Sequence, residues 1–131
     1  KKIKLGNTHS TRDFSFIDDT VEGFISALKK NTSGEIINLG NGFDISIKDL
    51  AKLIAREMSV KIEIITDKKR VRPKKSEVDK LRSNNNKAKK ILRWQPKYKN
   101  KKGLIKGLVK TIECFSTEEN LENYKSNLYN I

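Results

Sequence analysis

The sequence of 131 residues has the length of about one ordinary domain, and its 35% hydrophobic and 34% charged residues allow one modest core. A net charge of +13 excludes an acidic tail and makes an anionic partner the default expectation. One cysteine excludes an intrachain disulfide, and with a single histidine no Cys/His zinc site can be assembled. The sequence shows no signal-peptide or membrane-spanning pattern, so we expect a cytoplasmic protein without membrane association.

The first part of the chain combines a strand pattern with a helix pattern. Ile3 and Leu5 alternate with lysines, so a strand pattern is already under way at the first residues. We therefore expect this sequence to be a piece of a longer chain. Beyond them, apolar residues recur at helical spacing, and Asp18 or Asp19 is expected to be the N-cap of this helix. The apolar stripe consists of Val21, Phe24, Ile25 and Leu28.

The middle of the chain predicts a strand, a helix and a second strand. The apolar run 35–39 is flanked by glycines and favours a strand. Ser46 followed by Asp49 resembles a capping box, because the hydroxyl can accept a backbone N–H while the carboxylate faces the positive end of the helix dipole. The helix that they begin is expected to reach Met58. Residues 61–66 alternate with a period of two, as in a half-buried strand.

The last part of the chain predicts a loop followed by helices. Residues 67–86 are polar and basic, and Pro73 excludes a helix through the first part, so we expect a long basic surface loop. A short helix at 88–92 should end before the WQP segment. Two helices follow, at 104–115 and from about Thr117, the latter with Leu121, Tyr124 and Leu128 on one face. We therefore predict a small α/β unit with two or three short strands and about five helices.

Five motifs in a fixed order carry a family resemblance. They are LGNTHSTRDFSFIDDTVEGFI (5–25), EIINLGNG (35–42), RPKKSEV (72–78), NNNKAKKIL (84–92) and WQP (94–96). Together they resemble the carboxy-terminal half of extended short-chain dehydrogenases/reductases that act on nucleotide sugars, the NAD-dependent epimerase/dehydratase family. The sequence is most similar to the branch with GDP-mannose 4,6-dehydratase and the legionaminic-acid-pathway dehydratase. The resemblance implies a small substrate-binding domain without its Rossmann domain.

The resemblance also implies which residues contact substrate. Arg12 of the R-D-F motif and Arg72 of the R-P motif would clamp the diphosphate of a nucleoside-diphosphate sugar. Guanidinium groups suit this role because they are planar, permanently charged and bidentate. Glu77 matches the acidic residue that accepts ribose hydroxyls, although its spacer from Pro73 is longer than in the R-P-T-E-V form.

Two asparagines complete the candidate substrate contacts. Asn7 and Asn41 lie in turn-like settings, where asparagine also serves tight backbone geometry. Tyr98 and Lys102 match the superfamily's catalytic Y-x-x-x-K pattern, but they follow WQP in a lysine-rich sequence, and we interpret this match as chance. We predict no catalytic, cofactor-binding or metal-binding residue in this chain, because the glycine fingerprint of dinucleotide sites is absent from it. NAD or NADP is expected in the complete enzyme.

The sequence thus predicts that residues 1–131 bind the nucleoside-diphosphate sugar of an NAD-dependent nucleotide-sugar 4,6-dehydratase or epimerase and are inactive alone. Elements within 1–45 would pack on the absent amino-terminal Rossmann domain, so the stripe from 21 to 28 should be exposed. The alternative is a small basic nucleic-acid-binding domain, for which the lysine-rich stretches 68–75 and 87–102 are the evidence. The aromatic residues are not interleaved with those stretches as stacking platforms would be. The base and the sugar stay open.

Overall fold

The computed structural model describes residues 1–71, 73 and 76–122. In this part of the chain the structure confirms the predicted class, a small α/β unit with five helices and a few short strands. The strands are β1 (Lys2–Leu5), β2 (Thr11–Asp13), β3 (Asp44–Ser46) and β4 (Glu63–Thr66). The helices are α1 (Ile17–Leu28), α2 (Ile47–Glu57), α3 (Asn86–Leu92), α4 (Asn100–Phe115) and α5 (Glu118–Glu122), with a 3-10 turn η1 (Lys68–Arg70).

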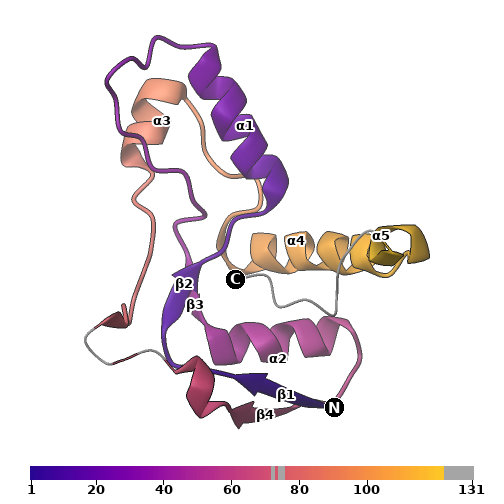
Figure 1. Cartoon of the computed structure of the whole chain (residues 1–131). Coiled ribbons are helices and arrows are strands. Elements are labelled where there is room, and N and C mark those ends of the chain that lie inside the picture. Colours follow the sequence, from indigo (N-terminus) through magenta and orange to yellow (C-terminus); the bar gives the residue numbers. More distant parts are fainter. Residues whose placement is uncertain (72, 74–75, 123–131) are drawn as a thin grey trace.

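The strands form two separate two-stranded sheets. β1 pairs in parallel with β4, with Ile3 opposite Ile64, and β2 pairs antiparallel with β3, with Arg12 opposite Ile45. Figure 1 shows α1 and α3 side by side at one end of the molecule and the β1–β4 sheet at the other, with α2 and α4 between them. β2 and β3 therefore lie where the two ends meet.

Two small hydrophobic clusters replace the single core that the composition predicted. The first contains Ile45 of β3, Leu53 of α2 and Leu104 of α4. The second contains Ala88 and Leu92 of α3 together with Trp94, and partly buried apolar residues of α1 and of the segment 37–39 pack against it. Each end of the molecule thus has its own apolar contacts.

The start of α2 confirms the capping-box prediction. Ser46 is the N-cap, and its Oγ accepts a hydrogen bond from the backbone N–H of Asp49 at 3.0 Å. The helix ends at Glu57, one residue before the predicted limit, and Met58 is its C-cap. Local sequence is sufficient here because donor and acceptor lie within one helical turn.

The helix predicted from the apolar stripe 21–28 is confirmed as α1, but the predicted N-cap is wrong and the helix begins earlier, at Ile17. Phe16 is the N-cap, and no side chain caps the helix. Asp19 is only 1% exposed, and its carboxylate accepts the backbone N–H groups of Lys97 at 2.7 Å and Tyr98 at 3.0 Å. Its backbone carbonyl accepts Nε1–H of Trp94 at 3.1 Å. Asp19 therefore fastens the connector 94–98 to α1.

The strand predicted at 35–39 is wrong for the described residues. Burial does alternate there, with Ile37 and Leu39 half-buried and Asn38 and Ile36 exposed, the last at 84%. A strand also needs a neighbour for its ladder of hydrogen bonds, and the described strands pair only with one another, β1 with β4 and β2 with β3. The apolar run between glycines predicted a strand here, but in the described residues this segment has no pairing partner.

The predicted loop 67–86 is partly structured in its described residues. It contains η1, and α3 already begins at Asn86. Further along, Lys80 forms a bridge with Thr11 of β2. The N–H of Thr11 donates to the carbonyl of Asp79 at 2.8 Å, and the N–H of Leu81 donates to the carbonyl of Thr11 at 3.1 Å. These bonds hold the second half of the segment beside β2.

The remaining helices follow the predicted order. α3 ends before Trp94, and Arg93 forms its left-handed C-cap with φ of 54°. α5 begins at Glu118, while Tyr124 and Leu128 of the predicted last helix lie outside the described residues. No helix in the described ranges combines the length and apolar character that crossing a membrane requires.

Gly103 lies at a close approach between α4 and the chain at Tyr98. A Cβ at this position would overlap the backbone carbonyl of Tyr98. Alanine favours a helix by about 1 kcal/mol over glycine, but the overlapping atoms are backbone and cannot rotate away. We therefore expect Gly103→Ala to lower the free energy of unfolding by about 1–3 kcal/mol in urea denaturation. The exposed Lys106→Ala on the same helix should change it by less than about 0.5 kcal/mol, and a stabilised Gly103→Ala would contradict the close approach.

Candidate functional site

The Arg12 side chain connects β2 with residues 77–78, which directly precede the residues that are hydrogen-bonded to β2 through their backbone. Its Nη2 lies 3.0 Å from Oε1 of Glu77, and its Nη1 donates to the carbonyls of Val78 at 2.7 Å and Thr11 at 2.8 Å. The side chain of Arg12 is 24% exposed and that of Glu77 is 11% exposed. The structure therefore brings together two candidate site residues that are 65 positions apart.

In the described part of the chain, the pair of Arg12 and Glu77 has hydrogen-bonding groups without a partner. A guanidinium carries five N–H donors, and the contacts to Glu77, Val78 and Thr11 use three of them. Within the described ranges the other two donors have no partner, and neither has Oε2 of Glu77. The pair can thus offer cationic donors to an anion such as phosphate and, beside them, a carboxylate oxygen to a hydroxyl group.

The remaining predicted substrate contacts are Arg72, Asn41 and Asn7. Arg72 lies outside the described residues. The Asn41 amide is buried in the fold, because its Nδ2 donates to the carbonyl of Phe14 at 3.2 Å and its Oδ1 accepts the N–H of Asn100 at 2.8 Å. The Oδ1 of Asn7 accepts the N–H of His9 at 3.0 Å, which is a local turn contact.

Asp13 joins three segments around the site, a role that sequence reasoning did not predict. Its carboxylate accepts the N–H groups of Asn41 and Gly42, each at 2.8 Å, and of Ser83 at 3.0 Å. The neighbour of Arg12 in the R-D-F motif thus positions β2 against the turn at 41–42 and the start of the α3 region. The only sequence signal was the motif itself, because the three donors are backbone groups.

Tyr98 of the Y-x-x-x-K match lies in an aromatic pair. Its ring centroid is 4.5 Å from that of Phe16, and Nζ of Lys110 lies 5.3 Å from the Tyr98 ring. A hydrogen bond with Tyr98 raises the pKa of Lys110, and the charges of Tyr98, Asp18 and Glu113 act in the same direction. The lysine beside the Tyr98 ring is therefore Lys110, which follows it by twelve positions and does not have the four-residue spacing of the Y-x-x-x-K motif.

A cluster of charges lies beside β2 and β3. Nζ of Lys80 is 3.7 Å from Oδ2 of Asp44. Interaction with the Thr11 hydroxyl lowers the pKa of Asp44, and the positive charges of Lys80 and Arg82 lower it further. Asp44 is therefore held in its charged form next to a mainly basic surface.

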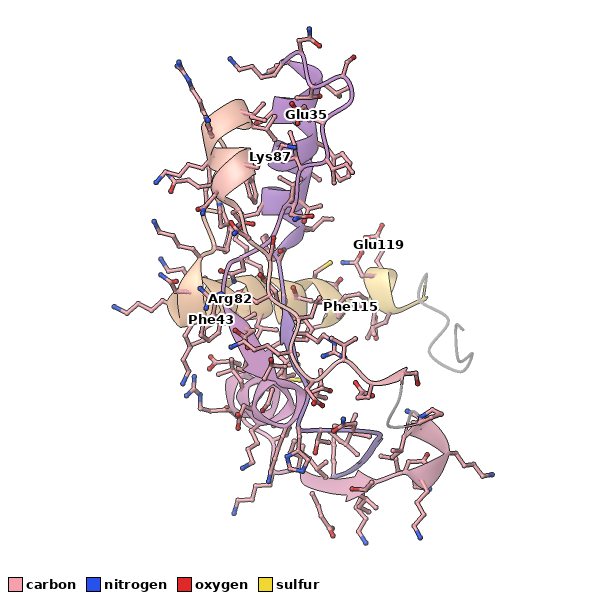
Figure 2. The ribbon with its side chains drawn as sticks, turned by 90° about the vertical axis from the view of Figure 1, so that its left-hand side faces the viewer. Glu35, Phe43, Arg82, Lys87, Phe115 and Glu119 are labelled. Carbon is pink, nitrogen blue, oxygen red and sulfur yellow. The ribbon has the colours of Figure 1, made fainter. Side chains whose placement is uncertain are left out.

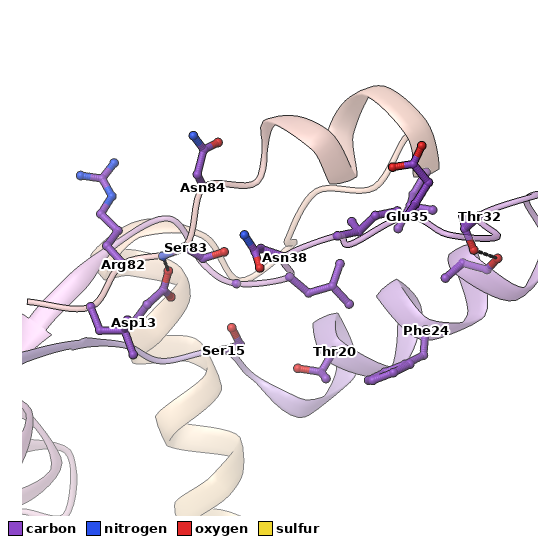
Figure 3. Close-up of a pocket in the computed structure, with 16 residues that line it drawn as sticks. Asp13, Ser15, Thr20, Phe24, Thr32, Glu35, Asn38, Arg82, Ser83 and Asn84 are labelled. Atoms are coloured by element: carbon purple, nitrogen blue, oxygen red, sulfur yellow. Dashed lines mark hydrogen bonds between the residues drawn. The ribbon is translucent and has the colours of Figure 1, made fainter. Parts of the chain in front are cut away.

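An open cavity of about 790 Å³ lies between α1, the segment 32–40 and residues 81–84. Figure 3 shows Asn38, Ser15 and Thr20 around it and the bond between Asp13 and Ser83 at one side. Lys87 and Glu35 form an ion pair near its far end, visible in Figure 2. Arg12 and Glu77 do not line this cavity. Nowhere in the described ranges do three His, Cys, Asp or Glu side chains form a group that could hold a metal ion.

The chain is similar in sequence to a known protein family and to individual enzymes. The profile of the family described as GDP-mannose 4,6 dehydratase matches residues 1–106. The chain is 34% identical over 128 residues to UDP-glucuronate 4-epimerase of Thermodesulfobacterium geofontis, covering 96% of this chain and 36% of that protein. It is 34% identical over 130 residues to dTDP-D-glucose 4,6-dehydratase of Homo sapiens, covering 92% and 33%.

Solved structures show the same similarity in three dimensions. UDP-glucose 4-epimerase of Thermotoga maritima, solved with UDP-glucose, superposes with a TM-score of 0.75 at 28% identity, covering 88% of this chain and 35% of that chain. The chain therefore spans about a third of the length of the relatives that it matches.

Proposed function

Because the chain belongs to the GDP-mannose 4,6-dehydratase family of nucleotide-sugar enzymes, we propose that it is the substrate-binding portion of an NAD-dependent nucleotide-sugar 4,6-dehydratase or epimerase. It would contact the diphosphate and the nucleoside of the substrate. The single observation that carries the proposal is the meeting of Arg12 and Glu77 from distant motifs in one partly buried pair.

The unused atoms of this pair fit the two ends of such a ligand. The two remaining N–H donors of Arg12 would bind phosphate oxygens, for which a permanently charged, planar group is well suited. The second carboxylate oxygen of Glu77, Oε2, would accept a ribose hydroxyl. Arg72, from the R-P motif, is proposed as the second cation on the diphosphate, and Asn7 and Asn41 as further contacts.

The cofactor is assigned to a different part of the enzyme. Close approach of a backbone to a dinucleotide pyrophosphate needs the glycine fingerprint, and residues 1–131 contain no G-x-G-x-x-G sequence. The residues of this chain therefore do not fit NAD, and no step of the reaction is assigned to it. Its proposed contribution is to bind and orient the nucleotide sugar.

The exposed face of α1 supports docking against a dinucleotide-binding domain. The predicted exposure of the stripe is confirmed: Leu28 is 87% exposed, and the other three members are also exposed. Ile36, in the unpaired segment 35–39, adds to the exposed apolar residues. An amphipathic helix normally buries such a stripe. We propose that the dinucleotide-binding domain covers this face.

Leu28→Lys tests the docking surface. The side chain is exposed, and a cation near a helix C-terminus is tolerated, so the free energy of unfolding should change by less than about 0.5 kcal/mol. Association with a separately expressed dinucleotide-binding domain of a relative, measured by calorimetry, should be lost. Lys30→Ala is the control and should associate like the wild type. Unchanged association of Leu28→Lys would exclude this face.

Ligand titrations distinguish the proposal from nucleic-acid binding. We expect UDP or GDP to bind at one saturable site in calorimetry. Random duplex DNA should bind weakly, and its binding should fall as salt rises because released counterions drive it. Tight, steeply salt-dependent DNA binding without nucleotide binding would favour the alternative of a basic nucleic-acid-binding domain.

A further inference from the structure

Three acceptors within the chain bind the Arg12 guanidinium. Two are backbone carbonyls, of Thr11 and Val78, and the third is Oε1 of Glu77. The backbone of Thr11 is itself hydrogen-bonded to the backbone of Asp79 and Leu81. The two carbonyl groups that Arg12 contacts therefore lie in segments that are hydrogen-bonded to each other. Glu77 is the only side chain among the three acceptors of this contact set.

We propose that Glu77 is a positioning residue for Arg12. Through Oε1 it aligns the guanidinium so that the unused N–H donors are already directed toward an anion, in addition to any ribose contact made by Oε2. This inference rests on the proposed function, because the anion is the diphosphate of a nucleotide sugar. An arginine that is free to rotate would have to be ordered when the ligand binds, which weakens binding.

Glu77 has two opposite effects on anion binding, and substitutions separate them. Its negative charge repels an anion near Arg12, while its hydrogen bond holds Arg12 in place. Glu77→Ala removes both the charge and the hydrogen bond. Glu77→Gln removes the charge but keeps an oxygen that can accept the bond from Nη2.

Inorganic pyrophosphate is the probe that isolates the positioning role, because it has no ribose. In calorimetric titrations at low salt we expect Glu77→Ala to weaken pyrophosphate binding by about tenfold, and Glu77→Gln to strengthen it by about threefold. Glu57→Ala is the matched control. It removes the carboxylate of another Arg–Glu pair, that of Glu57 with Arg56 on α2, and it should change binding little.

The order of the Arg12 side chain provides a readout without ligand. In NMR relaxation of arginine Nε–H groups, Arg12 should be ordered in the wild type and in Glu77→Gln but mobile in Glu77→Ala. Equal order in Glu77→Ala, or pyrophosphate binding that is unchanged or tighter in that variant, would overturn the inference. If Glu77→Ala does not fold, weaker pyrophosphate binding by Glu77→Gln than by the wild type would overturn it.

A separate substitution tests the proposed function itself. Arg12→Ala is expected to abolish pyrophosphate binding, and wild-type affinity in that variant would refute the diphosphate site itself. In that case the relaxation measurement still decides whether Glu77 orders Arg12.

Discussion

Asp19→Ala is expected to lower the free energy of unfolding by about 3 kcal/mol or more, because two backbone N–H groups lose their charged acceptor. These are the N–H groups of Lys97 and Tyr98, and the carboxylate that accepts them is almost fully buried. Alanine supplies no acceptor, and water has little access to the position. Urea denaturation followed by circular dichroism measures the change.

The neighbouring acid provides the matched control. Asp18 lies in the same first helical turn, but its side chain is 57% exposed and its partner, Nζ of Lys110, is 3.9 Å away. Exposed pairs of this kind contribute about 0–1 kcal/mol, so Asp18→Ala should cost far less. Both substitutions remove a charge from the positive end of the helix, which makes the dipole effect similar. Equal losses would show that the connector 94–98 does not depend on Asp19.

Arg12→Lys is expected to weaken binding of UDP or GDP by about 10- to 100-fold, since each lost charge-assisted contact is worth about 1.5–3 kcal/mol. A lysine keeps the positive charge but not the planar fork, so it cannot bind Glu77, Val78 and a phosphate together. Calorimetry on the wild type and the variant measures the ratio of dissociation constants.

The control for this experiment removes a charge elsewhere. Lys101 is exposed at the start of α4, and Lys101→Gln should change nucleotide affinity by less than about threefold, because screening limits the effect of a distant surface charge. If Lys101→Gln weakens binding as much as Arg12→Lys does, the affinity comes from general positive charge and the Arg12 site is refuted.

Features fixed by neighbouring residues could be predicted from the sequence. The cap at Ser46 and the apolar stripe of α1 depend on residues within a few positions of each other, and the structure confirms both. The N-cap prediction at Asp18 or Asp19 failed because a distant segment, at 97–98, uses the Asp19 carboxylate. Composition and spacing do not contain that contact.

In the candidate site, too, local motifs identified individual residues, whereas the contacts between these residues depend on distant segments. The motifs identified Arg12 and Glu77 as residues of interest, but their direct contact follows from the bonds between β2 and residues 78–81, which no local pattern encodes. The contacts of the Asn41 amide could not be predicted either, because its partners are backbone groups from two other segments. The strand predicted at 35–39 is wrong because an apolar run between glycines does not determine whether a pairing partner lies beside it.

An NMR titration of the 131-residue chain with UDP-glucose or a GDP-sugar tests the central claim most directly. The six arginines of the sequence give few Nε–H signals, which allows Arg12 to be followed individually. We expect a saturable shift of the Arg12 signal together with the backbone amides of Glu77 and Val78. Shifts spread over the lysine-rich stretch 87–102, with Arg12 unchanged, would contradict it.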